Sequence, residues 1–310
     1  MASRKIPRIA VLLPCYNEEA TIGATVTGFL KALRGVTVYV YDNNSRDRTR
    51  EVATKAGAVV RSEKQQGKGH VVRRMFADVD ADVYVMADGD LTYDPEAAPA
   101  MVEMLLADQL DMVVGTRRHE TKDAYRGGHV IGNRLFTGLL AGLFGRSFSD
   151  IFSGYRVFSR RFVKSFPVLS SGFEIETEIS VHALELRMPV GEVETIYAAR
   201  PEGSESKLST VSDGWRILKT IATLYRVERP VLFYGTIAAL FVIAAVLLAV
   251  PLVETYLQTG LVPRVPTAIL VTGMVIVAVL CFFAGLILDT VTRGRREVRR
   301  LHYLSLAAPQ

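Results

Sequence analysis

Two long apolar runs near the C-terminus set the strongest constraint on how this chain can fold. Val231–Val253 and Pro266–Leu288 each contain 23 residues without a charged side chain. At about 1.5 Å per residue, each run spans about 34 Å as a helix, enough to cross a hydrocarbon core of about 30 Å. Glu254 and Arg264 bracket the short link between the runs, so we predict a hairpin of two transmembrane helices over residues 230–290. The other interpretation is a pair of buried core helices.

Positive charge flanks the two runs on their outer sides. Arg226 and Arg229 precede the first run, and the residues that follow the second are Arg293, Arg295, Arg296, Arg299 and Arg300. Arginine and lysine concentrate in cytoplasmic segments of membrane proteins. We therefore expect a multi-pass protein of the cell membrane with both termini in the cytosol, a cytosolic domain over 1–211 and a basic cytosolic tail over 291–310.

Composition limits what the rest of the chain can be. The protein has 310 residues, 49% of them hydrophobic, and 37 basic against 32 acidic side chains give a net charge of +5. This mild excess suits a membrane surface or phosphate ligands and is too small to indicate nucleic acid. Cys15 and Cys281 are the only cysteines, so no disulfide framework is expected. The N-terminus enters a strand pattern directly, without the apolar core of a signal peptide.

The first part of the chain alternates apolar runs with helical patterns. The apolar runs are Ile9–Leu13, Val36–Tyr41, Val83–Ala87 and Met112–Gly115, and the helical patterns between them cover 18–33, 47–56 and 95–107. Continuous apolar strands indicate a mostly parallel sheet with helices on both faces. Ligands of such sheets bind at the carboxyl ends of the strands, so the chemistry should lie in the loops that follow them.

The acidic turn after Val83–Ala87 is the sharpest of these loops. Asp88 and Asp90 are separated by Gly89 alone, so both carboxylates can reach one hard cation, Mg²⁺ or Mn²⁺, which can also bind a diphosphate. A solvated acidic turn is the other interpretation.

Two further loops end on the same predicted edge. Pro14, Tyr16 and Glu18 follow the first apolar run and offer an aromatic ring and an acceptor, while Asp42 and Asn44 follow the second and could bind a base and ribose. A plain Asx turn that caps the next helix would look the same.

Familiar phosphate-binding loops are missing from this edge. No Gly-x-Gly-x-x-Gly follows the first run, and the segment Gly67-Lys68-Gly69 lacks the P-loop spacing. A metal-bound nucleotide diphosphate remains as the predicted ligand.

Basic residues form another group near two amphipathic segments. Arg134 opens the amphipathic pattern 134–146, and the stretch from Arg200 to Lys207 precedes a second one, which we expect to form a juxtamembrane helix over 212–229. Together with Arg117 and Arg156, they are candidates to gather a phosphate at the membrane surface. An ordinary amphipathic helix on the sheet is the alternative for both segments.

The order of short motifs resembles a known family. Pro-Cys-Tyr-Asn-Glu-Glu, Asp-Asn-Asn-Ser, Gly-Lys-Gly, Asp-Gly-Asp, Asp-x-x-Ser-Gly-Tyr-Arg and Arg-x-x-Gly-x-x-Ser-Lys occur in the order of the inverting family 2 glycosyltransferases, in the branch that includes dolichol-phosphate mannose synthases. The resemblance covers about residues 7–225. It implies a GT-A fold, a divalent cation, a GDP- or UDP-sugar donor and a polyprenyl phosphate acceptor.

The resemblance also implies roles for single residues. The implied donor-binding residues are Pro14, Tyr16, Glu18, Asp42, Asn44, Lys68, Asp88, Gly89 and Asp90, of which Asp88 and Asp90 hold the metal. The implied acceptor-phosphate residues are Arg117, Arg134, Arg200, Ser206 and Lys207. Asp88, Asp90 and Arg117 are the expected catalytic residues, and Asp150 joins them if a general base is used; a structural partner for Arg156 is the alternative for Asp150.

Some features depart from the family pattern. Asn43-Asn44 stands where relatives often have Asp-Gly, and Thr92 stands where many have Gln, which leaves donor contacts open. The Gln-x-x-Arg-Trp signature of processive synthases is absent, so transfer of one sugar to a lipid is favoured.

Two other functions remain as alternatives to this transferase. One is a sugar-phosphate nucleotidyltransferase, and the other is a non-catalytic, membrane-anchored module that binds a nucleotide sugar. The identity of the sugar, the choice between UDP and GDP, the lipid chain length and any homo-oligomerisation stay open.

Overall fold

The computed structural model divides the chain into two compact units. It describes residues 6–119, 138, 141, 142, 145, 148–170, 172, 174–198, 222, 223 and 225–309. The first unit comprises residues 1–214 together with 299–310, and the second comprises residues 215–298.

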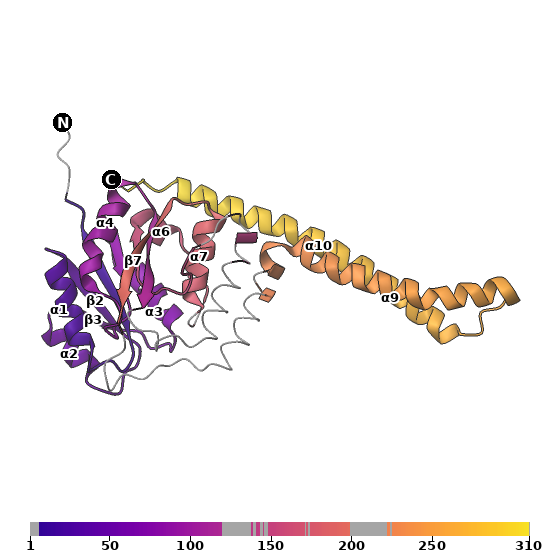
Figure 1. The fold of residues 1–310 in the computed structure, drawn as a ribbon, viewed down its shortest axis with the longest axis horizontal. Coiled ribbons are helices and arrows are strands. Elements are labelled where there is room, and N and C mark those ends of the chain that lie inside the picture. The colour runs from indigo at the N-terminus through magenta and orange to yellow at the C-terminus, as the bar shows by residue number, and fades with distance from the viewer. Residues whose placement is uncertain are drawn as a thin grey trace. The chain divides into compact units, whose positions relative to one another are not determined.

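A seven-stranded sheet forms the centre of the first unit (Figure 1). Its strands, in the order β3-β2-β1-β4-β6-β5-β7, are β3 (Val59–Ser62), β2 (Thr37–Asp42), β1 (Ile9–Cys15), β4 (Val83–Met86), β6 (Arg156–Ser159), β5 (Met112–His119) and β7 (Val190–Tyr197). β6 runs antiparallel to β4 and β5, and all other neighbours are parallel. The mostly parallel sheet predicted from the continuous apolar runs is therefore confirmed.

Helices cover both faces of this sheet, as predicted. They are α1 (Ile22–Ala32), α2 (Thr49–Lys55), α3 (Lys68–Asp78), the short 3₁₀ helix η1 (Pro95–Ala97), α4 (Ala98–Ala107), α6 (Arg160–Ser165) and α7 (Ile175–Glu185). In β4, Val83 and Val85 join the core formed with α1 and α4, whereas Tyr84 contacts the Phe76 ring of α3. Alternate residues of a strand point to opposite faces, and because helices cover both faces here, the whole strand is buried.

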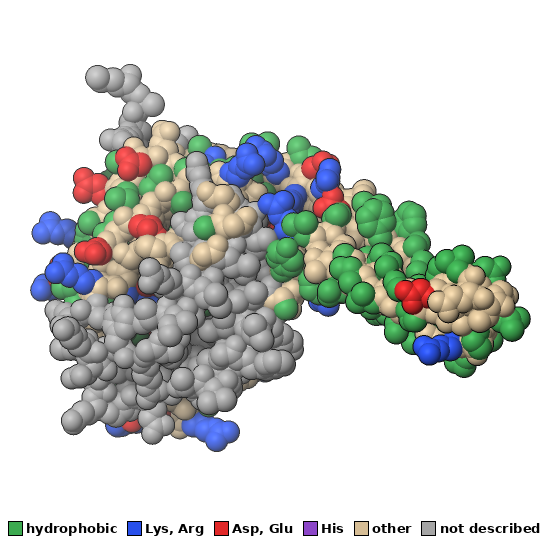
Figure 2. Space-filling model, turned by 45° about the vertical axis from the view of Figure 1, so that its right-hand side comes forward, with side chains coloured by type: hydrophobic (Ala, Val, Ile, Leu, Met, Phe, Trp, Pro, Cys, Tyr) green, Lys and Arg blue, Asp and Glu red, His purple; other side chains and the backbone are tan. Residues whose placement is uncertain are grey.

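The second unit contains two long apolar helices, α9 (Pro230–Thr259) and α10 (Val265–Leu304), whose last residues from 299 belong to the first unit. Both are long and apolar enough to cross a membrane, with mean hydropathies of 2.8 and 2.7 in their most apolar windows. Only 11% of each window is buried, whereas the core helix of a soluble protein is mostly buried. Figure 2 shows hydrophobic side chains over much of this hairpin's surface.

The link between these helices is shorter than predicted. Glu254 lies inside α9, which continues through Pro251 to Thr259 and is followed by Gly260, a residue with a left-handed φ of 65°. The Gly260 N–H donates to the Tyr256 carbonyl at 2.8 Å, which closes the helix end, and 261–264 then connect to α10.

Small residues allow α9 and α10 to pack closely. Ala238, Ala245 and Ala278 are buried, and a Cβ on Gly285 would lie 3.2 Å from the Tyr234 Cβ. At the other end from the link, Arg296 forms an ion pair with the buried Glu228. The hairpin is thus held by packing along its length and by charge at its base.

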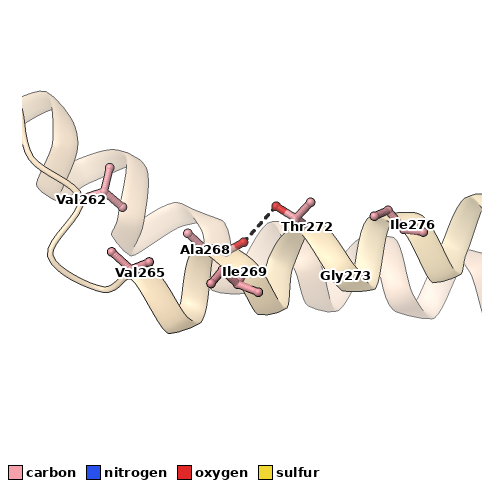
Figure 3. A pocket seen from close by; sticks show the side chains of 7 residues that line it. All are labelled: Val262, Val265, Ala268, Ile269, Thr272, Gly273 and Ile276. Carbon is pink, nitrogen blue, oxygen red and sulfur yellow. Dashed lines mark hydrogen bonds between the residues drawn. The ribbon is translucent and has the colours of Figure 1, made fainter.

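A shallow apolar groove lies near the link end of the hairpin (Figure 3). The hydroxyl of Thr272 donates to the Ala268 carbonyl at 3.0 Å, within α10 itself. The other side chains that line it are apolar: Val262, Val265, Ile269 and Ile276, beside Gly273. The groove carries no charged group and is therefore no candidate for the catalytic centre.

The segment 291–310, which the sequence predicted as a basic cytosolic tail, contains the end of α10. α10 remains helical to Leu304, and its last turns pack on the first unit through Arg299 and Tyr303. Arg299 pairs with Glu185 at 2.7 Å, and Tyr303 is buried. The segment folds onto the unit because Glu185 and Asp111 offer buried carboxylates to these side chains.

Candidate active site

The carboxyl ends of β1, β2 and β4 bring the three predicted loops to one edge of the sheet. β1 lies between β2 and β4, with Cys15 opposite Asp42 and Leu12 opposite Met86. The residues that follow each strand therefore become neighbours. This part of the predicted site follows from parallel strand order alone.

The first two loops are joined by hydrogen bonds between their backbone and side chains. The Asn17 N–H donates to the Ser45 hydroxyl at 2.9 Å, and the Arg46 N–H donates to Asn17 Oδ1 at 2.9 Å. The Glu18 N–H donates to the Thr49 hydroxyl at 2.8 Å. The loops that carry Pro14, Tyr16 and Glu18 on one side and Asp42 on the other thus form one rigid rim.

Asp42 and Asn44 occupy different environments on this rim. Asp42 is buried and accepts from the Ser45 N–H, three residues on, at 3.3 Å, whereas an Asx turn would bond the N–H two residues on. Asn44 has a left-handed φ of 66° and donates to the Lys64 carbonyl at 2.9 Å. Its amide therefore supports the segment that leads into α3.

Asn43, which departs from the family pattern, supports the same segment. Its side chain donates to the carbonyls of Glu63 and Gln65 at 2.9 and 2.8 Å and accepts from the Gly67 N–H at 2.7 Å. These three bonds hold the chain immediately before Lys68. The substitution of Asp-Gly by Asn43-Asn44 is thus matched by contacts to the protein's own backbone.

Lys68 lies between two carboxylates in the interior of the site. Its Nζ is 2.5 Å from Asp88 Oδ1 and 2.6 Å from Glu176 Oε1, and the Lys68 side chain is 9% exposed. Burial lowers the pKa of this ammonium, but the charges of Asp88 and Glu176 outweigh it, so the net direction is upward. Lys68 is therefore a permanent cation beside the acidic turn.

Glu176 is a site residue that the sequence did not single out. It lies in the first turn of α7, where an acidic side chain is expected to compensate the helix dipole. Glu174 and Glu178 share that part of the sequence, and Glu178 instead accepts from the N–H groups of Leu169 and Ser170 at 2.8 Å each. Only the tertiary structure distinguishes Glu176 from its two neighbours.

The acidic turn presents its two carboxylates differently. The Asp88 side chain is 30% exposed, and a Cβ on Gly154 would lie 2.9 Å from its Oδ2, so the glycine leaves room for the carboxylate. Asp90 is buried, and its Oδ1 accepts from the hydroxyl and N–H of Thr92 at 2.6 and 3.2 Å. Thr92, which replaces the glutamine of many relatives, thus orients Asp90.

The carboxylate oxygens of this turn suit a divalent cation whose remaining ligands come from a substrate. Carboxylate oxygens are preferred by Mg²⁺, which proteins commonly bind through one or two carboxylates plus substrate phosphates. Among the described residues, no group of three or more His, Cys, Asp and Glu side chains could hold an ion by itself. Asp88 and Asp90 could supply carboxylate oxygens to an ion whose other ligands are phosphate oxygens.

A second ion pair lies next to the first. Arg117 Nε and Nη2 donate to the two oxygens of Asp150 at 2.7 and 2.8 Å, and the guanidinium lies 5.4 Å from the centre of the Tyr197 ring. Burial lowers the pKa of Arg117, but the hydrogen bond to Asp150 and the charges of nearby groups together outweigh it, so the net direction is upward. Asp150 thus pairs with Arg117 and not with Arg156, which was the structural partner expected for it as the alternative to a general base.

Tyr93 joins the two ion pairs into one site. Its hydroxyl accepts from the Gly154 N–H at 2.9 Å, beside Asp88. The centre of its ring lies 5.3 Å from that of Tyr155 and 5.2 Å from that of Tyr197. Burial raises the pKa of the Tyr93 hydroxyl above its usual range, so it stays neutral. The sequence did not indicate this residue.

Arg156 is excluded from phosphate binding by its position. It is fully buried, and its guanidinium donates to the carbonyls of Ser153 and Ile151 at 2.9 and 2.6 Å. Burial lowers its pKa to about 10, which still leaves it protonated at neutral pH. The expectation that Arg156 gathers phosphate at the surface is therefore wrong. Arg134, Arg200, Ser206 and Lys207 lie outside the described residues, as does most of the two predicted amphipathic segments.

Comparisons with known proteins identify the family of the chain. The model of the family described as Glycosyl transferase family 2 matches residues 10–166. Glycosyltransferase AglJ of Haloferax volcanii is 33% identical over 231 residues, which are 74% of this chain and 76% of that protein. The dolichyl-phosphate hexose transferase of the same organism is 28% identical and covers 71% of this chain and 95% of its own length.

A solved structure shows the same fold. It is glucosyl-3-phosphoglycerate synthase from Mycobacterium tuberculosis in complex with Mn²⁺, UDP and glucosyl-3-phosphoglycerate, with a TM-score of 0.59, 25% identity and coverage of 71% of this chain and 79% of that one. The matched family, the relatives and the shared GT-A fold all indicate sugar transfer. The chain belongs to glycosyl transferase family 2, and it is a glycosyltransferase.

Proposed function

We propose that this protein transfers one sugar from a nucleotide diphosphate sugar to a polyprenyl phosphate at the cytosolic face of a membrane, with inversion at the sugar carbon. The observation that carries the proposal is the junction of the acidic turn Asp88–Asp90 with the Lys68 and Arg117 cations on a unit that continues into a long apolar hairpin. Relatives named for dolichyl-phosphate and undecaprenyl-phosphate substrates support the same acceptor class.

The donor would bind along the carboxyl edge of β1, β2 and β4. Pro14, Tyr16, Glu18 and Asp42 line the rim where the nucleoside would lie, and the diphosphate would approach Asp88, Gly89 and Asp90. When bound to Asp88 and Asp90, Mg²⁺ or Mn²⁺ would offset the charge of the leaving diphosphate. The mycobacterial neighbour, crystallised with Mn²⁺ and UDP, supports this assignment.

Lys68 would add a fixed positive charge beside this diphosphate. Its ammonium is shared by Asp88 and Glu176, so it stays in the site without a substrate. The reaction requires such charges because an acceptor phosphate is already largely dianionic at pH 7. Electrostatic stabilisation and positioning thus replace proton transfer as the main task of the protein.

The bond changes balance without a general base. A lone pair of the acceptor phosphate oxygen forms the new bond to the anomeric carbon, and the bond from that carbon to the diphosphate oxygen breaks with its electron pair retained by the nucleoside diphosphate. No proton moves in this step. Asp150, whose two oxygens are occupied by Arg117, would therefore position this guanidinium beside the acceptor phosphate. We assign the remaining acceptor contacts to Arg134, Arg200, Ser206 and Lys207.

The hairpin would confine the enzyme to the membrane that holds its acceptor. Arginines near both outer ends of α9 and α10 favour a cytosolic location for these ends and for the catalytic unit. A domain of 1–211, a juxtamembrane helix of 212–229 and spans within 230–290 would follow in that order.

The experiment that tests the proposal is transfer by detergent-solubilised, full-length protein. The protein is incubated with Mn²⁺, a panel of GDP- and UDP-sugars and either undecaprenyl or dolichyl phosphate, and the lipid fraction is analysed by mass spectrometry. We expect a lipid-linked monosaccharide, lost with EDTA and with Asp90→Ala. A 3-phosphoglycerate arm tests for a soluble acceptor. Transfer only to this acceptor, or full activity in EDTA, would contradict the proposal.

A further inference from the structure

The Asp88-Gly89-Asp90 turn is held from behind by helix α1. The hydroxyl of Thr21, which precedes the first residue of α1, donates to the Gly89 carbonyl at 2.9 Å. The hydroxyl of Thr25, one turn further along, lies 3.3 Å from the same oxygen. Both threonines are buried, so water does not compete for this carbonyl. Two side chains of one helix thus converge on the middle peptide of the acidic turn.

Thr21 makes the stronger of these two contacts. Each hydroxyl carries one proton, and Thr25 Oγ1 is closer to the Thr21 carbonyl, at 3.1 Å, than to Gly89. Thr21 Oγ1 has two other acceptors on Glu18, at 3.3 and 3.4 Å, both further away than the Gly89 carbonyl. The Thr21 proton is therefore directed to the turn.

This hydrogen bond replaces the usual task of a threonine at a helix start. Ser and Thr at the N-cap normally accept from a backbone N–H of the first turn, which is a common reason for their presence there. Thr21 occupies the N-cap of α1 but makes no side-chain cap hydrogen bond. Its hydroxyl donates to Gly89 instead, while the Glu18 carbonyl accepts from the N–H groups of Thr21 and Ile22 at 3.1 and 2.9 Å.

Packing restricts the turn from the same side. A Cβ on Gly89 would lie 2.5 Å from Cys15 Sγ and 3.3 Å from Ile22 Cδ1. The turn therefore cannot move towards β1 and α1, and the Thr21 bond opposes movement away from them. Because Asp88 and Asp90 are attached to the two sides of Gly89, fixing this peptide fixes the directions in which both carboxylates leave the turn.

We propose that Thr21 is a positioning residue for the cation held by Asp88 and Asp90. This inference rests on the proposed metal role of these two residues. Thr21 does not contact the cation; it lowers the cost of cation binding by holding the Gly89 peptide in the conformation that aligns the carboxylates. Removal of the hydroxyl with retention of the side-chain shape should therefore weaken cation affinity.

The test compares isosteric and conservative variants of full-length protein in detergent. Binding of Mn²⁺ is measured by electron paramagnetic resonance of the free ion, with UDP and in parallel with GDP, and the melting temperature is measured without metal. Thr21→Val should raise the Kd for Mn²⁺ roughly fivefold, the effect of losing one typical hydrogen bond. Thr21→Ser should bind like the original protein, because it keeps the hydroxyl.

Two further variants complete the design. Thr27→Val makes the same substitution in α1 where the hydroxyl donates to the Gly23 carbonyl and is exposed, so Mn²⁺ affinity should not change. Thr25→Val removes the second hydroxyl near Gly89 and should raise the Kd by about twofold, in keeping with its longer contact. If Thr21→Val does not fold, Thr21→Ala, which also removes the hydroxyl, takes its place, and an unchanged Kd in that variant overturns the inference.

The outcomes separate this inference from the proposed function. Absence of Mn²⁺ binding by the original protein, or binding that survives Asp90→Ala, contradicts the metal role itself. If the original protein binds Mn²⁺ and Asp90→Ala abolishes binding, but Thr21→Val binds as well as the original protein, then only the role of Thr21 is wrong. A melting temperature lowered equally by Thr21→Val and Thr21→Ser, with unchanged Mn²⁺ affinity, assigns Thr21 to structure alone.

Discussion

The hydroxyl of Tyr303 donates to Asp111 Oδ2 at 2.7 Å, across 192 positions of the sequence. Asp111 is fully buried before β5 and also accepts from Ser159 and from both Nε and Nη2 of Arg161. The Arg161 guanidinium in turn lies 4.4 Å from the centre of the Tyr303 ring. The last turns of α10 thus complete a buried polar cluster of the catalytic unit.

Replacing Tyr303 by Phe should destabilise the catalytic unit while keeping the ring over Arg161. One acceptor position of a buried carboxylate loses its donor, which typically costs about 1–3 kcal/mol. We expect a lower midpoint of thermal unfolding in detergent, with little change in the Km for the sugar donor. Tyr256→Phe, at an exposed position of α9, is the matched control and should leave the midpoint unchanged. Equal stability of the two variants would contradict a structural role for this bond.

Deleting residues 299–310 should destabilise the catalytic unit, which the loss of a flexible tail would not do. The deletion removes both Arg299 and Tyr303, so Glu185 and Asp111 each lose a partner in the interior. Loss of one partner from a buried carboxylate is costly, and we expect protease sensitivity and poor yield of the folded unit. Deleting only 306–310 retains both contacts and should resemble the intact protein in limited proteolysis. For the same reason, an enzyme that ends at Glu228 should lose stability as well as transfer to long-chain lipid.

Lys68→Met should reduce the catalytic efficiency, kcat/Km, by at least about tenfold, mainly through a higher Km for the donor, because a charged hydrogen bond contributes about 1.5–3 kcal/mol. The substitution leaves Asp88 and Glu176 without the cation that lies between them. Lys64→Met, at an exposed position of the preceding loop, is the control and should retain the original donor Km. Steady-state kinetics over a range of donor concentrations separates the two parameters, and an unchanged donor Km in Lys68→Met would exclude Lys68 from the donor site.

Arg117→Lys and Asp150→Asn should reduce transfer by similar factors, because each breaks the same paired contact. A lysine cannot reproduce the two parallel bonds that a guanidinium makes with a carboxylate. If Asp150 acts through Arg117, the double variant should be no worse than the more impaired single variant. Arg118→Lys, at an exposed neighbouring position, should keep full activity. Additive losses of activity in the double variant would instead assign Asp150 an independent role.

His182→Leu should make the free energy of unfolding less dependent on pH below about pH 6.5. Burial, together with the charge of Arg299, lowers the pKa of His182 to about 3, compared with an ordinary value of 6.5. Between these values the unfolded chain binds a proton that the folded protein does not, so the free energy of unfolding falls as the pH falls from about 6.5. One proton corresponds to at most about 1.4 kcal/mol per pH unit.

Thermal unfolding between pH 5 and pH 8 measures this slope. Ser165→Ala removes the hydroxyl that lies 3.3 Å from His182 Nε2 but keeps the imidazole, so it should retain the slope of the original protein. An equally steep acid limb in His182→Leu would show that other groups dominate the acid sensitivity.

Several parts of the fold could be predicted from short-range patterns. Continuous apolar runs indicated β1, β2, β4 and the start of β5, because strands buried on both faces cannot alternate with polar residues. The strands β3, β6 and β7 were not predicted. β3 and β7 carry polar or exposed residues, and β6 contains Arg156, whose burial depends on carbonyls supplied by the loop before it.

The candidate site was predictable to a similar extent. Loops after parallel strands converge on one edge, so the neighbourhood of Asp42 and the Asp88–Asp90 turn followed from strand order. Glu176, Tyr93 and Thr21 gave no such signal, since an acidic first turn, a buried aromatic ring and an N-cap threonine are common for structural reasons.

By itself, the sequence determined which segments are apolar enough to form the sheet and the hairpin and where acidic and basic groups follow a strand. These properties depend on composition and periodicity over a few residues, and they hold wherever the segments come to lie. Only the tertiary structure decided that Asp88 and Glu176 share Lys68, that Arg117 pairs with Asp150 and that Tyr303 reaches Asp111. Such pairings join residues tens to hundreds of positions apart, and they form only when packing of the whole unit removes the side chains from water and brings their partners within reach.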